Sequence, residues 1–222
     1  MNKLFCLKPW LPLASVLLVA ALQSAQAGTM DPLNPAELSR ATSMATAASP
    51  ANTQRSLSVN TTPAPELLLV ERHPNKKGQT ARLADVYTYD YSSNETILTL
   101  INLDTNQVLS TQRQQNLQLP LTDNELHRAA ALIFADDEQR SLLEREFRRI
   151  TGQPLTDLYQ QLQVKAFVFH ASSLPEQLNA ASRQCGLHRC AQVLLYTADS
   201  VVFEISPIVN LSAGVITQNI GF

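Results

Sequence analysis

Two stretches of this chain repeat each other in the same order, and this repeat constrains the fold more than any other feature. Residues 33–41 align without gaps on residues 121–129, with Leu, Glu, Leu, Arg and Ala at the same offsets. Residues 82–89 align in the same way on residues 189–196. The first match is typical of a helix and the second of a strand. The order predicts one helix-plus-strands module that occurs twice.

The N-terminus has the features of a secretory signal. Lys3 and Lys8 flank the start of the chain, residues 11–22 are mostly apolar, and residues 25–27 read Ala-Gln-Ala, a small-x-small cleavage site. The apolar run is short for a membrane span, so an uncleaved anchor is the weaker interpretation. We therefore predict a signal peptide over residues 1–27 and a periplasmic or secreted protein without membrane contact after cleavage.

Charge argues against two classes of partner. The net charge is −2, and removal of the two signal lysines would take it to −4. DNA and anionic membranes are bound mainly by basic side chains that neutralise phosphate or lipid charge. A mildly acidic chain with scattered lysines and arginines is a poor binder of either, so we expect no nucleic acid partner.

The first predicted module covers residues 28–116. Asn34 is a good N-cap, Pro35 suits the first helical position, and Glu37 completes a variant capping box. Residues 46–65 are rich in Ala, Ser, Thr, Asn and Pro, which predicts a low-complexity linker. The alternating segments that follow predict four strands joined by short turns, at residues 66–72, 83–91, 96–103 and 107–112.

The second predicted module covers residues 117–222 and opens with a capping box of Thr122 and Glu125. Further helices are expected at residues 137–150, 155–162 and 174–184, and strands at residues 164–170, 191–197, 201–206 and 215–220. Pro207 interrupts one of these strands, which indicates an edge or a bulge. The fold class is thus α+β: two tandem small modules, each a helix packed on a roughly four-stranded antiparallel sheet of the cystatin-like kind.

Two cysteines remain after signal cleavage, Cys185 and Cys190. In an exported chain they are expected to form a disulfide, which stabilises such a short loop by roughly 2 kcal/mol. The alternatives are a redox pair or part of a metal site. A redox pair usually has two intervening residues and a closed zinc site needs a fourth ligand, so the structural bridge is the stronger interpretation.

Tyr87, Tyr89 and Tyr91 fall on one face of a predicted strand. Tyrosine is enriched at interfaces, so the row is a possible binding surface. The commoner alternative is a row that packs beneath a helix with its hydroxyl groups at the rim.

Three parts of the chain follow one another in a distinctive order: residues 31–38, the strand and hairpin of residues 82–109, and residues 118–126 followed by 135–137. In these parts the chain resembles the two small N-terminal domains of copper amine oxidases. The resemblance implies two related α+β modules in succession.

Catalysis in that family needs a quinone-forming tyrosine after an asparagine and three copper-binding histidines, two of them as His-x-His. Here Tyr91 stands in Tyr-Asp-Tyr-Ser, and the four histidines lie far apart in sequence. No catalytic residue, metal ligand or cofactor is therefore carried over from the family.

These observations lead us to expect an exported, non-catalytic binding or assembly protein, whose partner would be another exported protein. The final strand is one candidate edge for recognising a peptide. Two other functions stay open. One is an accessory subunit or remnant of a copper and quinone amine oxidase. The other is a small-ligand carrier with a pocket between helix and sheet.

Overall fold

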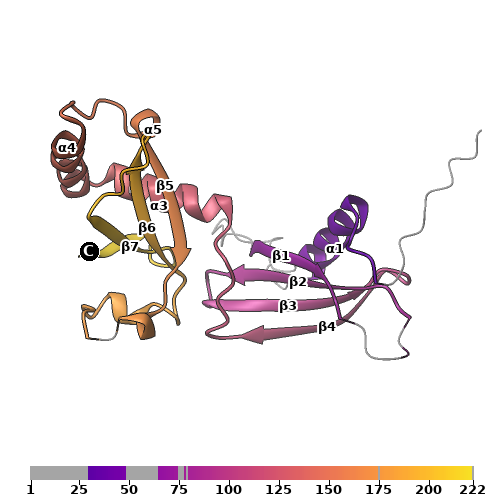
Figure 1. The fold of residues 1–222 in the computed structure, drawn as a ribbon. Helices are drawn as coiled ribbons and strands as arrows, with labels where there is room; N and C mark the ends of the chain where they lie inside the picture. Colours follow the sequence, from indigo (N-terminus) through magenta and orange to yellow (C-terminus); the bar gives the residue numbers. More distant parts are fainter. Residues whose placement is uncertain (1–29, 49–64, 75–77, 79, 175, 222) are drawn as a thin grey trace, which may run out of the picture.

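A computed structural model describes residues 30–48, 65–74, 78, 80–174 and 176–221. The predicted signal peptide and residues 49–64 of the predicted linker lie outside them. Within the described residues the chain forms two lobes, each with its own four-stranded antiparallel sheet (Figure 1). The predicted α+β fold of two modules is confirmed.

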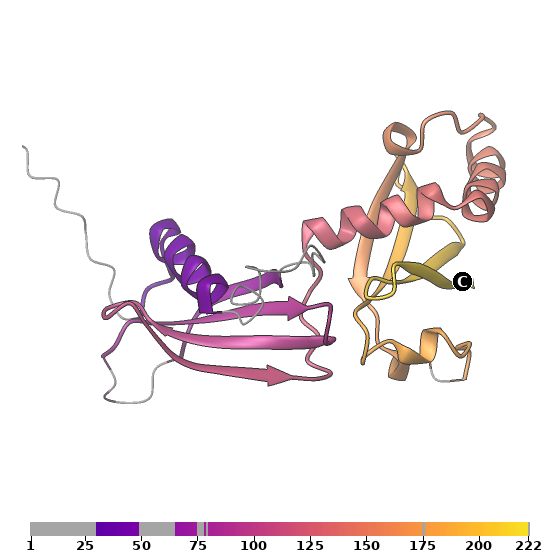
Figure 2. The ribbon, with the colours of Figure 1, turned by 180° about the vertical axis from the view of Figure 1, so that it is seen from behind.

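The first module joins one helix to a simple meander of strands. Seen from behind, the helix lies across the first sheet (Figure 2). Its small side chains Ala41 and Ala45 pack against Ala84, Val86 and Ile101, so helix and sheet approach closely. The elements are α1 (Pro35–Ala48), β1 (Glu66–Arg72), β2 (Leu83–Asp90), β3 (Glu95–Asn102) and β4 (Gln107–Gln114), with sheet order β1-β2-β3-β4.

Helix α1 begins at the capping box that the sequence predicts. The Asn34 side-chain oxygen accepts from the Glu37 N–H at 3.0 Å, and the Glu37 carboxylate accepts from the Asn34 N–H at 2.9 Å. The helix runs to Ala48, so it includes the first residues of the predicted linker.

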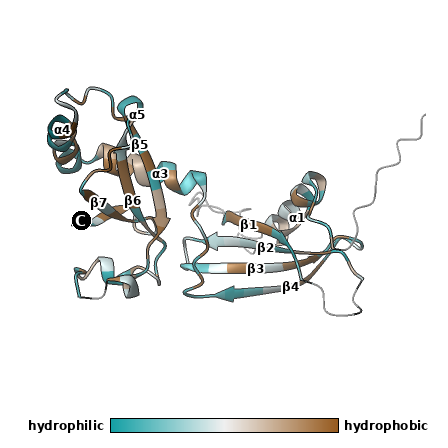
Figure 3. Cartoon of the chain, viewed as in Figure 1, coloured by the Kyte–Doolittle hydropathy of each residue, from teal (hydrophilic) through white to brown (hydrophobic). Residues whose placement is uncertain are grey.

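The second module repeats this plan and adds two helices. Helix α3 crosses the second sheet, and the residues of β5 and β6 are coloured largely apolar in Figure 3. Phe134, Leu143, Phe147, Val193 and Leu195 are among the side chains that fill the core. The elements are α3 (Asp123–Ala135), α4 (Asp137–Thr151), α5 (Leu158–Gln161), β5 (Leu162–Val168), β6 (Cys190–Thr197), β7 (Ile205–Asn210) and β8 (Val215–Gly221), with sheet order β5-β6-β7-β8.

The capping residues in the sequence correctly predict where α3 begins and where α4 ends. Thr122 and Glu125 form both hydrogen bonds of the predicted capping box at the start of α3. Gly152 ends α4 in the left-handed conformation, at φ 70°, and its N–H donates to the Arg148 carbonyl at 2.9 Å. Glycine adopts this conformation without the steric cost of a Cβ atom.

The helix predicted at residues 174–184 is wrong. A 3-10 turn, Ala171–Ser173, precedes the segment, and a second one, Ser182–Gln184, lies at its end. Asn179 donates to the Thr217 carbonyl at 2.6 Å and accepts from the Ser182 N–H at 2.8 Å. Such side-chain bonds compete with helical backbone pairing, so the segment lies against β8 as an irregular loop.

The strand predicted at residues 201–206 begins only at Ile205, and Pro207 lies in its interior. This strand is central rather than an edge, so the bulge alternative is correct: the register with β8 shifts between Ile208 and Val209. The proline has no N–H to donate. The Ser206 hydroxyl instead donates to the Val193 carbonyl at 3.0 Å.

In the described part of the chain, the helices are all too short or too polar to cross a membrane.

The core of the first module gives a direct test of the packing. Ile101 is fully buried, whereas Leu109 on β4 is 49 % exposed. Ile101→Ala should lower the free energy of unfolding by roughly 2–5 kcal/mol because it leaves a cavity. Urea denaturation measures the loss, and Leu109→Ala is the control, expected within about 0.5 kcal/mol of wild type. Equal losses in the two variants would contradict the packing described.

Candidate functional site

The same buried ion pair occurs once in each module, between residues that are equivalent in the repeat. The Arg82 Nε and Nη2 groups donate to the two carboxylate oxygens of Glu37, both at 2.9 Å. The Arg189 Nε and Nη2 groups donate to Glu125 in the same pattern, at 2.5 and 2.8 Å. Both pairs therefore have the two-bond geometry that suits guanidinium and carboxylate groups.

Each arginine also holds the chain that enters the helix. Arg82 donates to the carbonyls of Asp31 and Pro32 at 2.6 and 2.8 Å. Arg189 donates to those of Leu119 and Pro120 at 2.7 and 2.9 Å. One guanidinium thus joins the strand, the first helical turn and the residues before it.

The sequence contains a pattern that could have predicted these ion pairs. A glutamate and an arginine recur together at equivalent positions of both copies. The capping pattern accounts for the glutamates by the helix caps alone and gives the arginines no role.

The ion pairs keep both carboxylates charged. Hydrogen bonds from Arg82 hold the pKa of Glu37 below its usual value, against the effect of burial. For Glu125, burial acts to raise the pKa, but the hydrogen bonds and charge of Arg189 outweigh it and the pKa is lowered.

The second ion pair is also the centre of a joint between the modules. Tyr91 follows β2 and donates its hydroxyl proton to Glu125 at 2.6 Å. The same hydroxyl accepts from Arg128 at 2.7 Å. The Arg189 guanidinium lies 5.6 Å from the centre of the Tyr89 ring, a cation–π distance. We use "the joint" for the six residues Glu66, Tyr89, Tyr91, Glu125, Arg128 and Arg189.

Glu66, the first residue of β1, completes the joint from the other side. Its carboxylate pairs with Arg128 at 2.7 Å and accepts from the Thr122 hydroxyl, also at 2.7 Å. Burial and the neighbouring Glu125 raise the pKa of Tyr91, so the phenol stays protonated as a donor. Hydrogen bonds and ion pairs link Glu66, Tyr91, Glu125, Arg128 and Arg189, and Tyr89 adds ring contacts with Tyr91 and Arg189. The joint thus connects the two modules through groups that are engaged with one another.

The three tyrosines of the predicted row do not share one environment. Tyr89 is buried and contacts Tyr91 edge to face at 4.8 Å between ring centres. Tyr87 is half exposed and donates to Glu71 at 3.2 Å. Helix α1 packs on Ala84 and Val86, on the other face of β2. The alternative of a row beneath a helix holds in part, because Tyr91 packs against the core around α3 and its hydroxyl group bonds Glu125 and Arg128. Binding through the tyrosines stays a prediction, and Tyr87 is the one that remains accessible.

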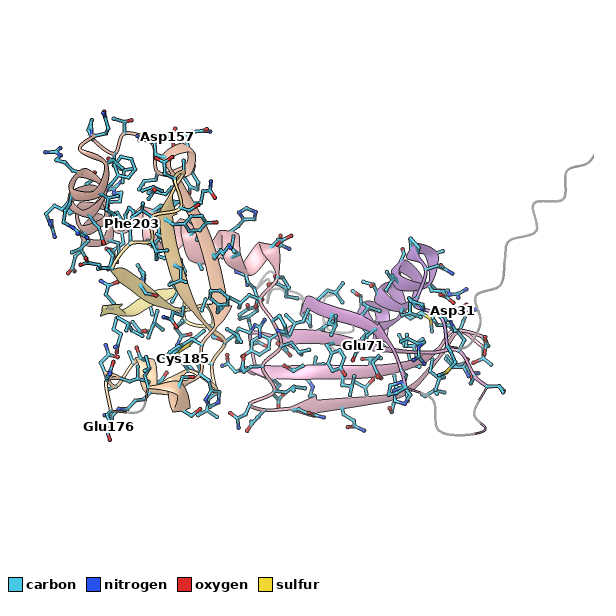
Figure 4. The ribbon with its side chains drawn as sticks, viewed as in Figure 1. Asp31, Glu71, Asp157, Glu176, Cys185 and Phe203 are labelled. Atoms are coloured by element: carbon cyan, nitrogen blue, oxygen red, sulfur yellow. A yellow bond between two sulfur atoms is a disulfide. The ribbon has the colours of Figure 1, made fainter. Side chains whose placement is uncertain are left out.

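The predicted disulfide is confirmed: Cys185 and Cys190 are bonded, with 5.4 Å between their Cα atoms. Figure 4 shows Cys185 where the 171–184 segment returns to the second sheet. The disulfide loop contains Arg189, so it encloses the residue at the centre of the joint. The bridge therefore limits the freedom of the segment that presents this arginine.

Three of the four histidines bond to separate polar partners. His73 pairs with Asp85 at 2.8 Å, His170 bonds Ser172 at 2.7 Å, and His188 bonds Asn210 at 3.0 Å. Among the described residues no group of three or more His, Cys, Asp or Glu side chains is placed to hold a metal ion. A surface hollow of about 450 Å³ is lined by Glu144, Arg145, Arg148 and Arg149, all from α4, so it is the outer surface of one helix.

Comparisons with known proteins support the fold alone. Scans of protein families and of curated proteins find no match to the sequence. Among solved structures, the chain is similar to a copper-containing benzylamine oxidase from Hansenula polymorpha, with a TM-score of 0.55 and 13 % identity. The similarity covers 88 % of this chain and 30 % of that one. The chain therefore has a fold similar to part of a copper amine oxidase.

Removal of one arginine tests the ion pairs. Arg189→Met leaves the fully buried carboxylate of Glu125 without its counter-ion, which should lower the free energy of unfolding by roughly 3–5 kcal/mol. Thermal or urea denaturation measures the change. Arg145→Met is the matched control, because that residue lies on the exposed surface of α4. A loss under 1 kcal/mol, a common value for exposed pairs, would show that the pair is dispensable.

The lowered pKa values of Glu37 and Glu125 predict acid sensitivity. The unfolded chain binds protons more readily than the folded chain, so this stabilisation is complete above the unfolded value near 4.5 and is lost as pH falls through the lower folded pKa. Denaturation across this range should show a steeper loss in wild type than in Glu125→Gln. Glu144→Gln, on the surface of α4, should keep the wild-type slope, and equal slopes in all three proteins would contradict the assignment.

Proposed function

We propose that this chain is an exported binding or assembly protein that performs no chemistry of its own. Its partner is another protein, which it meets through the sheet faces that its helices leave open. Export is supported by the signal-like sequence of residues 1–27 and by the disulfide between Cys185 and Cys190, a bond typical of oxidising compartments.

The observation that carries the proposal is the face of the first sheet opposite α1. We use "the first open face" for Leu69, Glu71, Tyr87, Leu98 and Leu100. Leu69 and Leu98 both stand directly opposite Tyr87 in the strand register, so the three side chains form one row across the sheet. Leu69 is 37 % exposed, and Tyr87 and Leu98 are half buried. An accessible apolar row with an aromatic centre is typical of protein-binding surfaces.

A second candidate is an accessory part of an amine oxidase assembly. It is favoured by the similarity in fold to part of the benzylamine oxidase. The two candidates differ in the partner rather than in the surface. A small-ligand carrier stays a prediction without a specific supporting observation.

Site-specific photo-cross-linking tests the proposal. A benzophenone amino acid in place of Leu98 should give covalent adducts with a partner in the exported fraction of the native host. The same probe in place of Leu109, which is exposed on β4 outside the row, should give far fewer adducts. Equal yields at the two positions, or none at Leu98, would contradict a binding role for this face.

The identity of the adduct then separates the two candidates. A captured protein that stains for quinone and carries copper favours the oxidase assembly. A captured protein with neither property favours a binding role of another kind.

A further inference from the structure

The second module has an open face equivalent to that of the first. We use "the second open face" for Lys165, Phe167, Leu194 and Tyr196. Leu194 and Tyr196 alternate on β6 with Val193 and Leu195, which are buried against α3. Phe167 is 55 % exposed and Lys165 is exposed.

The repeat relates the two faces residue by residue. In the alignment, Tyr87 corresponds to Leu194 and Tyr89 corresponds to Tyr196. In the first module, the Tyr89 end of the face is covered by the second module, with Arg189 at 5.6 Å from its ring centre. In the second module, Tyr196 has its own Lys165 at 5.8 Å and is half exposed. A surface that a neighbouring domain buries in the first copy is thus accessible in the second.

The two open faces carry opposite charge. Glu71 on β1 belongs to the first face, and Asp85 beside it is paired with His73. Figure 4 labels Glu71 on the first sheet. No lysine or arginine shares this face among the described strand residues. The second face carries Lys165, and no aspartate or glutamate shares it on β5 to β8.

We propose that the first open face of one copy of this chain binds the second open face of another copy. The inference rests on the proposed function in treating the faces as binding surfaces, and it names the partner. Apolar rows pack against each other as in a sheet-on-sheet contact, and Glu71 of one copy pairs with Lys165 of the other. Made reciprocally, the contact closes a two-fold dimer, and made once per copy, it extends a chain.

Charge reversal tests the proposal, because one reversal should weaken self-association and the complementary reversal should restore it. Wild type should self-associate as concentration rises in sedimentation velocity or light scattering. Lys165→Glu alone and Glu71→Lys alone should each weaken association at least about tenfold, because each places like charges in contact. An equimolar mixture of the two single variants should associate again, since both contacts between one variant and the other then join opposite charges. The double variant Glu71→Lys/Lys165→Glu should do the same.

A surface variant and two measurements of folding serve as controls for the charge reversals. Glu144→Lys lies on α4 outside both faces and should associate as wild type does. Circular dichroism and the melting temperature establish that each variant is folded. A protein that stays monomeric at every concentration, or whose association ignores both reversals, overturns the inference. If it is overturned while the Leu98 probe still captures a different protein, the proposed function stands and only the identity of the partner changes.

Discussion

The structure depends on a buried arginine–glutamate pair that is built twice. A buried charge pair loses hydration on folding, so it stabilises a protein only when nearly every polar atom finds a partner. Both pairs meet this condition. Each glutamate caps its helix while it binds its arginine, and each arginine donates to two further carbonyls. Few other geometries satisfy so many donors at once, which specifies where the helix starts relative to the sheet.

The second ion pair lies at the centre of the joint between the modules. Tyr91 of the first module adds a hydrogen bond to Glu125, and Glu66 engages Arg128 and Thr122. In the first copy, Arg40 stands at the position of Arg128, and both side chains are exposed. The same local device therefore serves folding in one module and domain orientation in the other. Because the disulfide loop contains Arg189, this residue is held both by the Cys185–Cys190 bond and by its ion pair with Glu125.

The placement of polar groups bears on function. The charged groups of the two ion pairs are buried and engaged with one another, and the two open faces present leucine, phenylalanine and tyrosine side chains together with Glu71 and Lys165. Accessible apolar surfaces of this kind are what the proposed binding role requires.

The sequence by itself determined the repeat, the fold class, the two capping boxes, the disulfide and most strands, because these follow from short-range patterns of apolar, capping and cysteine residues. It did not reveal the loop of residues 171–184, whose side-chain bonds to β8 replace a helix. Nor did it show which side of the sheet Tyr87 and Tyr89 occupy, because alternation assigns residues to two faces without saying which one a helix covers. Tertiary structure alone decided that Glu125 and Arg189, 64 positions apart, meet Tyr91 in one buried network, since only packing brings such distant charges out of water together.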